Sequence, residues 1–215
     1  MIALSEIVKA KRQISNTVTK TPCALAPLLS LEVGAEVYLK KENLQITGAY
    51  KLRGAYNKIA SLTKEEQKRG VIAASAGNHA QGVAYSARSF GIQATIIMPE
   101  ATPLLKVTGT RALGAEVILH GDNYDEAYAY AKTYAKEHGL TFIHPFEDEV
   151  VIAGQGTVAL EMIDEINDLD IVVIPIGGGG LISGMSSAIK QIDPKIRVIG
   201  VNAAGAPAMC ESFHA

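Results

Sequence analysis

The feature that most constrains the fold is a unit of apolar strand and capped helix that repeats between residues 70 and 143. In three units a short apolar run is followed by a helical stretch and a glycine that stops the helix, and a fourth apolar run closes the series. The apolar runs cover residues 71–74, 94–98, 115–119 and 140–143, and the helical stretches cover 78–90, 103–113 and 122–138. Short strands that alternate with helices form right-handed crossovers, which place the strands in one parallel sheet. The sequence therefore predicts an α/β fold.

Further apolar runs outside this block predict a second sheet built from both ends of the chain. They cover residues 36–40 before the block, and 171–174 and 197–201 after it. We therefore predict a small inserted α/β domain over residues 49–145, and a large domain made of residues 1–48 and 146–215. No low-complexity linker marks either crossing, so the two open, mainly parallel-sheet lobes are expected to pack closely.

The composition argues against several classes of function. A formal net charge of −2 over 215 residues gives no bulk attraction to nucleic acid or to an anionic membrane. The N-terminus has no basic segment followed by an apolar one, and no run reaches the ~18 apolar residues of a spanning helix. Cys23 and Cys210 lie far apart and lack metal-ligand spacing. We expect a cytoplasmic protein with no metal site and no nucleic-acid or membrane partner.

Lys51 lies where the sequence predicts the start of a helix, within the motif Thr47–Ala55. Helix N-termini disfavour a cation, by ~0.3–1 kcal/mol where exposed. Taken alone, an ordinary surface lysine is the simpler interpretation, because Lys is almost always exposed. Gly48 and Gly54 on either side permit close backbone approach, which favours a neutral amine bonded to a carbonyl cofactor. Lys51 is the candidate catalytic residue.

Four consecutive glycines, Gly177 to Gly180, follow an apolar strand and precede an amphipathic stretch that begins at Leu181. A strand, a glycine turn and a helix start present unpaired N–H groups to an anion. A flexible turn is the alternative, although each glycine forfeits roughly 0.5–1 kcal/mol relative to alanine. The spacing matches neither the dinucleotide pattern nor the P-loop. A phosphate is the predicted ligand, and with a lysine for an aldehyde it indicates pyridoxal phosphate.

A second anion site is predicted in the segment Ser75–Gly82, between the first strand of the repeated block and its helix. Open α/β sheets bind ligands at this position. Ser75 or Asn78 could equally be a helix cap. Gly77 beside polar side chains favours a cradle for a substrate carboxylate, and leaves Asn78 to bond a cofactor oxygen. His79 taken alone is more often a structural hydrogen-bonding residue than a catalyst.

Together these motifs resemble those of the fold-type II pyridoxal phosphate enzymes, and among them the threonine (serine) dehydratases. The resemblance covers nearly the whole chain and rests on four ordered motifs, at residues 40–55, 75–82, 151–157 and 177–180. It implies a lyase of amino-acid metabolism, such as isoleucine synthesis, with a small amino acid as its substrate. Such an enzyme converts L-threonine to 2-oxobutanoate, and L-serine to pyruvate, with release of ammonia.

The resemblance also implies a role for each candidate residue. Lys51 would form the Schiff base with the cofactor and then act as base and acid at the substrate Cα. Asn78 would hydrogen-bond the phenolic oxygen of the pyridine ring. The backbone would hold the two anions, with Gly177, Gly178, Gly179, Gly180 and Leu181 around the phosphate, and Ser75, Ala76, Gly77 and His79 around the substrate carboxylate.

Serine racemase is the nearest rival function. Racemases of this family usually have a second serine where this chain has Ala76, so racemisation is disfavoured, and Phe146 also resembles the dehydratases. Two departures from the family pattern are Ala49, which replaces a common serine, and Asn202, which replaces a glutamate associated with a cation site in some relatives.

The chain ends at Ala215, before the segment that in this family supplies the partner of the pyridine nitrogen. We therefore expect the N-terminal part of a catalytic region, with an incomplete large domain. The apolar surface left uncovered would favour a homo-oligomer. A catalytically inactive fragment that binds pyridoxal phosphate is the third alternative.

Overall fold

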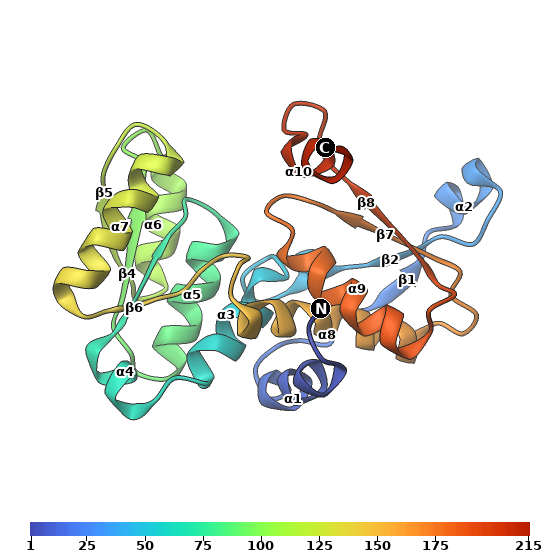
Figure 1. Ribbon diagram of the computed structural model, residues 1–215, viewed down its shortest axis with the longest axis horizontal. Coiled ribbons are helices and arrows are strands. Elements are labelled where there is room, and N and C mark those ends of the chain that lie inside the picture. Colours follow the sequence, from blue (N-terminus) through green and yellow to red (C-terminus); the bar gives the residue numbers. More distant parts are fainter.

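The computed structural model describes residues 1–215 and shows two lobes side by side (Figure 1). One lobe contains a four-stranded parallel sheet with the strand order β5-β4-β3-β6. Its strands are β3 (Val71–Ala74), β4 (Ala94–Met98), β5 (Glu116–Leu119) and β6 (Thr141–Phe142). Its helices are α4 (Lys64–Arg69), α5 (Asn78–Ser89), α6 (Leu104–Ala112) and α7 (Tyr124–His138). The prediction of an α/β fold with a parallel sheet is confirmed.

Helices cover both faces of this sheet because alternate strand residues point to opposite sides. Val71 and Ala73 of β3 belong to the same core cluster as Val83 of α5. Ile72 of β3 instead packs in a cluster with Ala131 of α7. Tyr128, Tyr130 and Tyr134 of α7 pack partly buried around that second cluster. Every residue of β3 and β4 is therefore buried, which explains their continuous apolar sequence.

The other lobe is assembled from both ends of the chain. Its strands are β1 (Cys23–Leu25), β2 (Tyr38–Lys40), β7 (Ile171–Pro175) and β8 (Arg197–Val201). Its helices are α1 (Leu4–Ile14), α2 (Pro27–Val33), the 3-10 helix η1 (Glu42–Leu44), α8 (Glu149–Glu165), α9 (Gly180–Ile192) and α10 (Ala208–His214). Its core joins α1 to α8, α9 and β7, although α1 and α9 lie at opposite ends of the sequence.

The prediction of one second sheet was wrong. β1 and β2 form an antiparallel pair, β7 and β8 form a parallel pair, and no hydrogen bonds join the two pairs. A groove of about 750 Å³, lined mainly by apolar side chains, includes residues of both β2 and β7. Apolar runs predict which segments become strands, but strand pairing also requires two edges to meet. Here the two edges do not meet, and the groove is the space lined by both strands.

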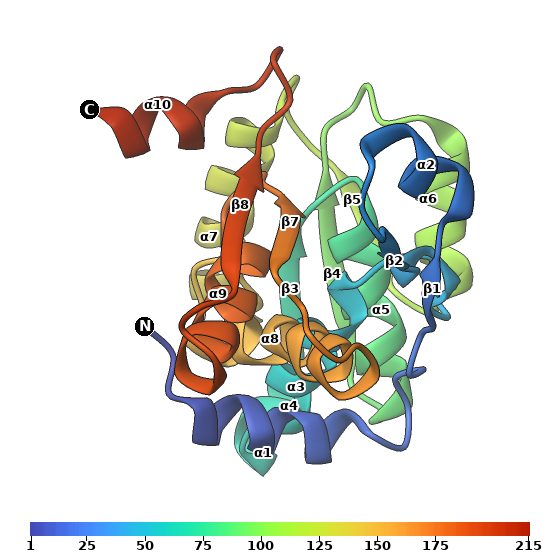
Figure 2. The same cartoon turned by 90° about the vertical axis from the view of Figure 1, so that its right-hand side faces the viewer.

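Helices α3 (Lys51–Ala60) and α8 lie where the two lobes meet (Figure 1), and Figure 2 shows α1 running below them. α3 packs against α5 on one side and against α8 on the other. The α3 and α8 backbones touch, since a Cβ atom on Gly154 would lie 2.6 Å from the Cα of Gly54. α9 approaches α8 as closely, since a Cβ on Gly184 would lie 2.3 Å from the Ile152 carbonyl oxygen.

The domain boundaries at residues 49 and 145 stay a proposal. None of the helices is long and apolar enough to cross a membrane.

Candidate active site

Lys51 is the first residue of α3, as the sequence predicts, and its amine lies between the lobes. The Nζ atom donates a hydrogen bond of 2.8 Å to the carbonyl oxygen of Pro145. Burial lowers the pKa of the Lys51 amine to about 8, because removal from water disfavours the charged form. The α5 helix packs directly on this residue, since a Cβ on Gly82 would lie 3.2 Å from the Lys51 carbonyl oxygen. The amine is therefore held in place and loses its proton more readily than an exposed lysine.

Phe146 lies between the residue that accepts from the Lys51 amine and the glycine run. It directly follows Pro145, and its ring lies against the turn between β7 and α9. A Cβ on Gly178 would lie 2.3 Å from Cδ1 of that ring, and one on Gly180 would lie 2.9 Å from the Phe146 Cα. Glycine at these two positions therefore leaves room for Phe146, a packing requirement that the sequence did not predict.

The start of α9 remains open to an anion. Gly179 is the N-cap, with φ +85°, and no side chain caps the first turn of the helix. The N–H groups at this end, including that of Leu181, have no intrahelical carbonyl partner. Gly177 is exposed, and a Cβ there would meet no atom within 4 Å. Backbone donors and the helix dipole at this position favour a phosphate-sized anion.

The start of α5 forms a second uncapped helix N-terminus. Gly77 is the N-cap without a side-chain hydrogen bond, so neither Ser75 nor Asn78 caps this helix. The Ser75 hydroxyl instead accepts a 3.2 Å hydrogen bond from the Gly77 N–H. Asn78 is exposed, and Ala76 is half-buried against the core of the sheet. The segment thus offers donors for an anion, although the Gly77 N–H already has a partner.

The His79 ring is turned into the protein. The side chain is 3% exposed, and Nε2 lies 2.9 Å from the Ile143 carbonyl oxygen. Burial lowers the pKa of this imidazole to about 3, so it is neutral at physiological pH. Its Nδ1 atom is buried without a hydrogen-bond partner. At a substrate carboxylate, His79 could therefore contribute its backbone N–H but not a positive charge.

Sequence reasoning missed the turn that presents Pro145 and Phe146. His144 holds this turn, because its Nδ1 accepts hydrogen bonds from Phe146 N at 3.2 Å and Glu147 N at 2.8 Å. Asp148 then caps α8 by accepting from Val150 N at 2.8 Å. The cap has a sequence signal, the acidic stretch 147–149. The carbonyl acceptor has none, because any residue could supply it.

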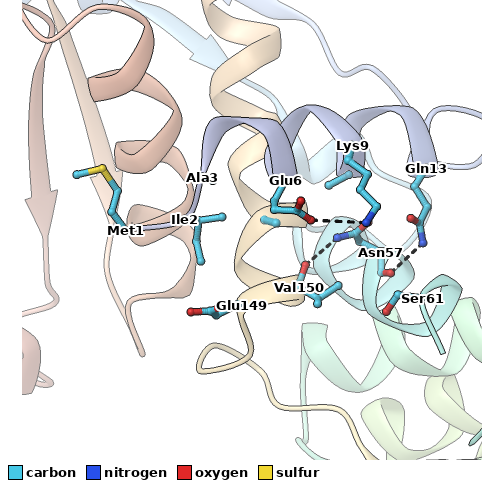
Figure 3. Close-up of a pocket in the computed structure, with 12 residues that line it drawn as sticks. Met1, Ile2, Ala3, Glu6, Lys9, Gln13, Asn57, Ser61, Glu149 and Val150 are labelled. Carbon is cyan, nitrogen blue, oxygen red and sulfur yellow. Dashed lines mark hydrogen bonds and ion pairs between the residues drawn. The ribbon is translucent and has the colours of Figure 1, made fainter. Parts of the chain in front are cut away.

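A hollow beside α1 lies away from these groups (Figure 3). It is lined by α1, the C-terminal half of α3 and the start of α8. Most of its polar side chains bond to one another or to the backbone, since Asn57 donates to Val150 O at 2.8 Å and Gln13 donates to Asn57 O at 3.2 Å. Glu6 and Lys9 form a further ion pair at 3.7 Å. None of the residues that the sequence marks for the cofactor or the substrate lines this hollow, so the candidate site is the one around Lys51.

A family model described as pyridoxal-phosphate dependent enzyme matches residues 14–215. The chain belongs to this family. An L-threonine ammonia-lyase of Thermotoga maritima is 55% identical over 214 residues, which is 100% of this chain and 53% of the relative. The structure of the processed form of threonine deaminase isoform 2 from Solanum lycopersicum matches with a TM-score of 0.94 and 43% identity, over 98% of this chain and 58% of that one. Maize serine racemase matches with a TM-score of 0.96 and 35% identity, over 99% and 65%. The chain thus spans between half and two thirds of these relatives.

Family membership confirms the cofactor that the sequence predicts, pyridoxal phosphate. The residues around Lys51 fit this group on structural grounds. A buried amine with a lowered pKa is suited to an aldehyde, and the uncapped start of α9 is suited to a phosphate. The Thr47 hydroxyl, four residues before Lys51, is buried without a hydrogen-bond partner. The assignment of single residues to the cofactor and the substrate is a proposal.

Proposed function

We propose that this chain carries the cofactor lysine of an enzyme that dehydrates and deaminates L-threonine to 2-oxobutanoate and ammonia, and L-serine to pyruvate and ammonia. The observation that carries the proposal is the position of the Lys51 amine. It donates a hydrogen bond to Pro145 O, and the next residue, Phe146, packs against the uncapped start of α9. Relatives at 55% and 46% identity are an L-threonine ammonia-lyase and a catabolic L-threonine dehydratase of Staphylococcus aureus, which supports this substrate.

Two helix N-termini would hold the two anionic groups. Backbone N–H groups of Gly177 to Leu181 would bind the cofactor phosphate, and those of Ser75 to His79 would bind the substrate carboxylate. Asn78, whose exposed side chain makes no other hydrogen bond, would donate to the ring oxygen of the cofactor. When bound, pyridoxal phosphate supplies an electron sink for the bond that breaks at the substrate Cα.

Lys51 would move the proton at the substrate Cα. A base works best when its pKa lies near the working pH, and the Lys51 amine has a pKa of about 8. Phe146 and the buried wall formed by β3 and α5 would limit the access of water to that amine. The neutral His79 would orient the start of α5 rather than exchange protons.

The direct test uses the protein encoded by its full reading frame, supplied with pyridoxal phosphate and L-threonine. We expect 2-oxobutanoate and ammonia in equal amounts, and pyruvate from L-serine. Chiral chromatography of serine after incubation separates the rival function. Because Ala76 provides no hydroxyl on the second face of Cα, little D-serine is expected. Abundant D-serine would favour a racemase, and cofactor binding without 2-oxo acid release would favour an inactive binding module.

We also propose that the protein is a homo-oligomer. Apolar side chains are exposed on two parts of the same lobe, including Leu28 and Leu31 of α2 and Val173 of β7, which are 84%, 82% and 61% exposed. Large exposed apolar surfaces commonly mark contacts with other chains. Sedimentation of the encoded protein is expected to give a species heavier than one chain, and a monodisperse monomer would contradict this.

A cytoplasmic location and a role in amino-acid metabolism are further parts of the proposal. Both cysteines are free, which suits a reducing compartment. The 2-oxobutanoate formed could enter isoleucine biosynthesis or amino-acid catabolism. Isotope tracing from labelled threonine into isoleucine in the source cells would distinguish these two fates.

A further inference from the structure

Arg53, two residues after Lys51, is completely buried. Its Nε and Nη2 atoms donate to the two carboxylate oxygens of Glu42 at 2.8 and 2.7 Å. Its Nη1 and Nη2 atoms also donate to the two oxygens of Glu161 at 2.6 and 2.8 Å. Nη1 makes a further bond of 3.2 Å to the Thr157 hydroxyl. All five N–H donors of the guanidinium are therefore used.

The charges of this cluster balance. Lys40 of β2 lies 2.7 Å from Glu161, and its side chain is only 6% exposed. Two buried cations, Arg53 and Lys40, thus face two carboxylates, Glu42 and Glu161. A third carboxylate, Glu165, lies 3.7 Å from Lys40 and is paired with Lys20 at 3.2 Å. Burial lowers the pKa of the Arg53 guanidinium, but the hydrogen bonds and charges of Glu42 and Glu161 outweigh this and raise it. Burial likewise raises the pKa of Glu42, but its bonds to Arg53 outweigh this and lower it. Loss of one partner would leave a buried charge uncompensated.

The cluster encloses the segment that carries Lys51. Glu42 lies before this segment and Arg53 lies after it, so their two-pronged ion pair closes residues 43–52 into a loop. The loop has a second tie, because Gln45 Nε2 donates to Thr19 O at 2.7 Å. Glu161 fixes the same point to α8, and the turn just before α8 carries the carbonyl that accepts from Lys51. The positions of Lys51 and of its acceptor, Pro145 O, are therefore both fixed relative to α8.

We propose that Arg53, held by Glu42 and Glu161, is a positioning residue that sets the place of the Lys51 amine. Arg53 lies within the protein among α3, α8 and η1, and the groups it bonds are not those around the start of α9 or α5. It would act through the backbone of α3 and would touch neither cofactor nor substrate. The inference rests on the proposed function of Lys51 as the cofactor lysine.

The test compares Arg53→Lys and Glu42→Gln with the wild type, in the protein encoded by the full reading frame. Lysine keeps the charge but cannot form the planar fork, and glutamine keeps the size but places an N–H group against the guanidinium. Each protein, stripped of cofactor, is mixed with pyridoxal phosphate, reduced with borohydride at set times, and digested for mass spectrometry of Lys51. We expect covalent attachment at least tenfold slower in both variants, expressed per folded molecule from near-ultraviolet circular dichroism.

A second measurement needs no cofactor. The rate of Lys51 acetylation by acetic anhydride, followed from pH 7 to 10, reports the titration of the amine. If the loop loosens, water reaches Lys51 and its midpoint moves upward, toward the ordinary value for lysine. The groups that face Lys51 are His79 of α5, His144 of the turn before α8, and the neighbouring Tyr50, and none of them is changed in the variants.

Asp164→Asn is the matched control, because it removes a carboxylate from the same turn of α8 but breaks only an exposed bond of 2.5 Å to Lys11. This variant should match the wild type in both measurements. The proposal is overturned if attachment falls only in proportion to the unfolded fraction, or if both variants keep wild-type rates and acetylation profiles. If cofactor and borohydride do not label Lys51 in the wild-type protein, the proposed function is refuted instead. The acetylation midpoints of the wild type and the variants would still test the positioning role.

Discussion

Replacing Lys51 with alanine should abolish covalent attachment of pyridoxal phosphate and lower 2-oxobutanoate formation by at least roughly 1,000-fold. The structure places this one amine on the Pro145 carbonyl, beside Phe146 and the start of α9. Absorption spectra of the cofactor and a coupled assay of the 2-oxo acid measure the two effects. Lys51→Arg is the control for charge, because arginine remains a cation but forms no such bond. Unchanged absorption in the alanine variant would remove Lys51 from the site.

The same residue makes the cofactor-free protein less stable near neutral pH. Folding lowers the pKa of Lys51 from 10.5 to about 8, so between these values the folded state binds fewer protons than the unfolded one. Stability of the wild type should therefore rise with pH through this window. The cost below pH 8 is at most about 3 kcal/mol, from the size of the shift and before any allowance for residual solvent. Lys51→Met keeps the aliphatic stem, and urea unfolding at pH 7 should show it more stable than the wild type, with the difference lost above pH 10.5.

Valine at Gly178 or at Gly179 should weaken binding of pyridoxal phosphate severely. A Cβ on Gly178 would lie 2.3 Å from the Phe146 ring, so the ring must move, and with it the adjacent Pro145 carbonyl that accepts from Lys51. Gly179 has φ +85°, which a β-branched residue rarely adopts. Overpacking of this kind costs about 1–3 kcal/mol, equivalent to roughly 5- to 150-fold in affinity if the strain is borne by the bound state.

Gly205→Ala provides the matched control, because this glycine lies outside the turn of residues 177–180 and a Cβ there would meet no atom within 4 Å. Equilibrium dialysis with pyridoxal phosphate should therefore give near wild-type affinity for the alanine variant. If the two valine variants also bind as the wild type does, the glycine turn is not the phosphate site.

The parts of the fold that could be predicted from sequence are those with local signals. Buried strands such as Ala94–Met98 read as continuous apolar runs, and α7 begins after a capping Asn123 and ends at Gly139. The pairing of β7 with β8 across α9 agrees with the prediction that these two runs share a sheet, but their separation from β2 could not be predicted. Whether β2 meets β7 depends on contacts between segments more than a hundred residues apart, which no local pattern encodes.

The candidate site divides in the same way. Lys51 and the glycine run were predicted because residue type and helix position together indicate chemistry. The inward turn of His79 toward Ile143 O was not predicted, because it depends on where β6 ends. The acceptor of the Lys51 amine, Pro145 O, is a backbone atom, and so no residue type could mark it. The Arg53 cluster was missed because its four charged residues come from four separate elements.

The insertion of one lobe into the other sets an order of events during synthesis on the ribosome. All four strands of the parallel sheet lie between residues 71 and 142, so this sheet can pair before the rest of the chain has emerged. The C-terminal end of α1 packs on α3 through Ile14 and Leu52, but Ile7 and Ala10 pack with α8 and α9, which are completed only at residues 165 and 192. Ile7 and Ala10, fully enclosed in the finished protein, must stay exposed until then. This segment is therefore made before the parallel sheet but buried after it, and in the interval it is open to capture by a chaperone.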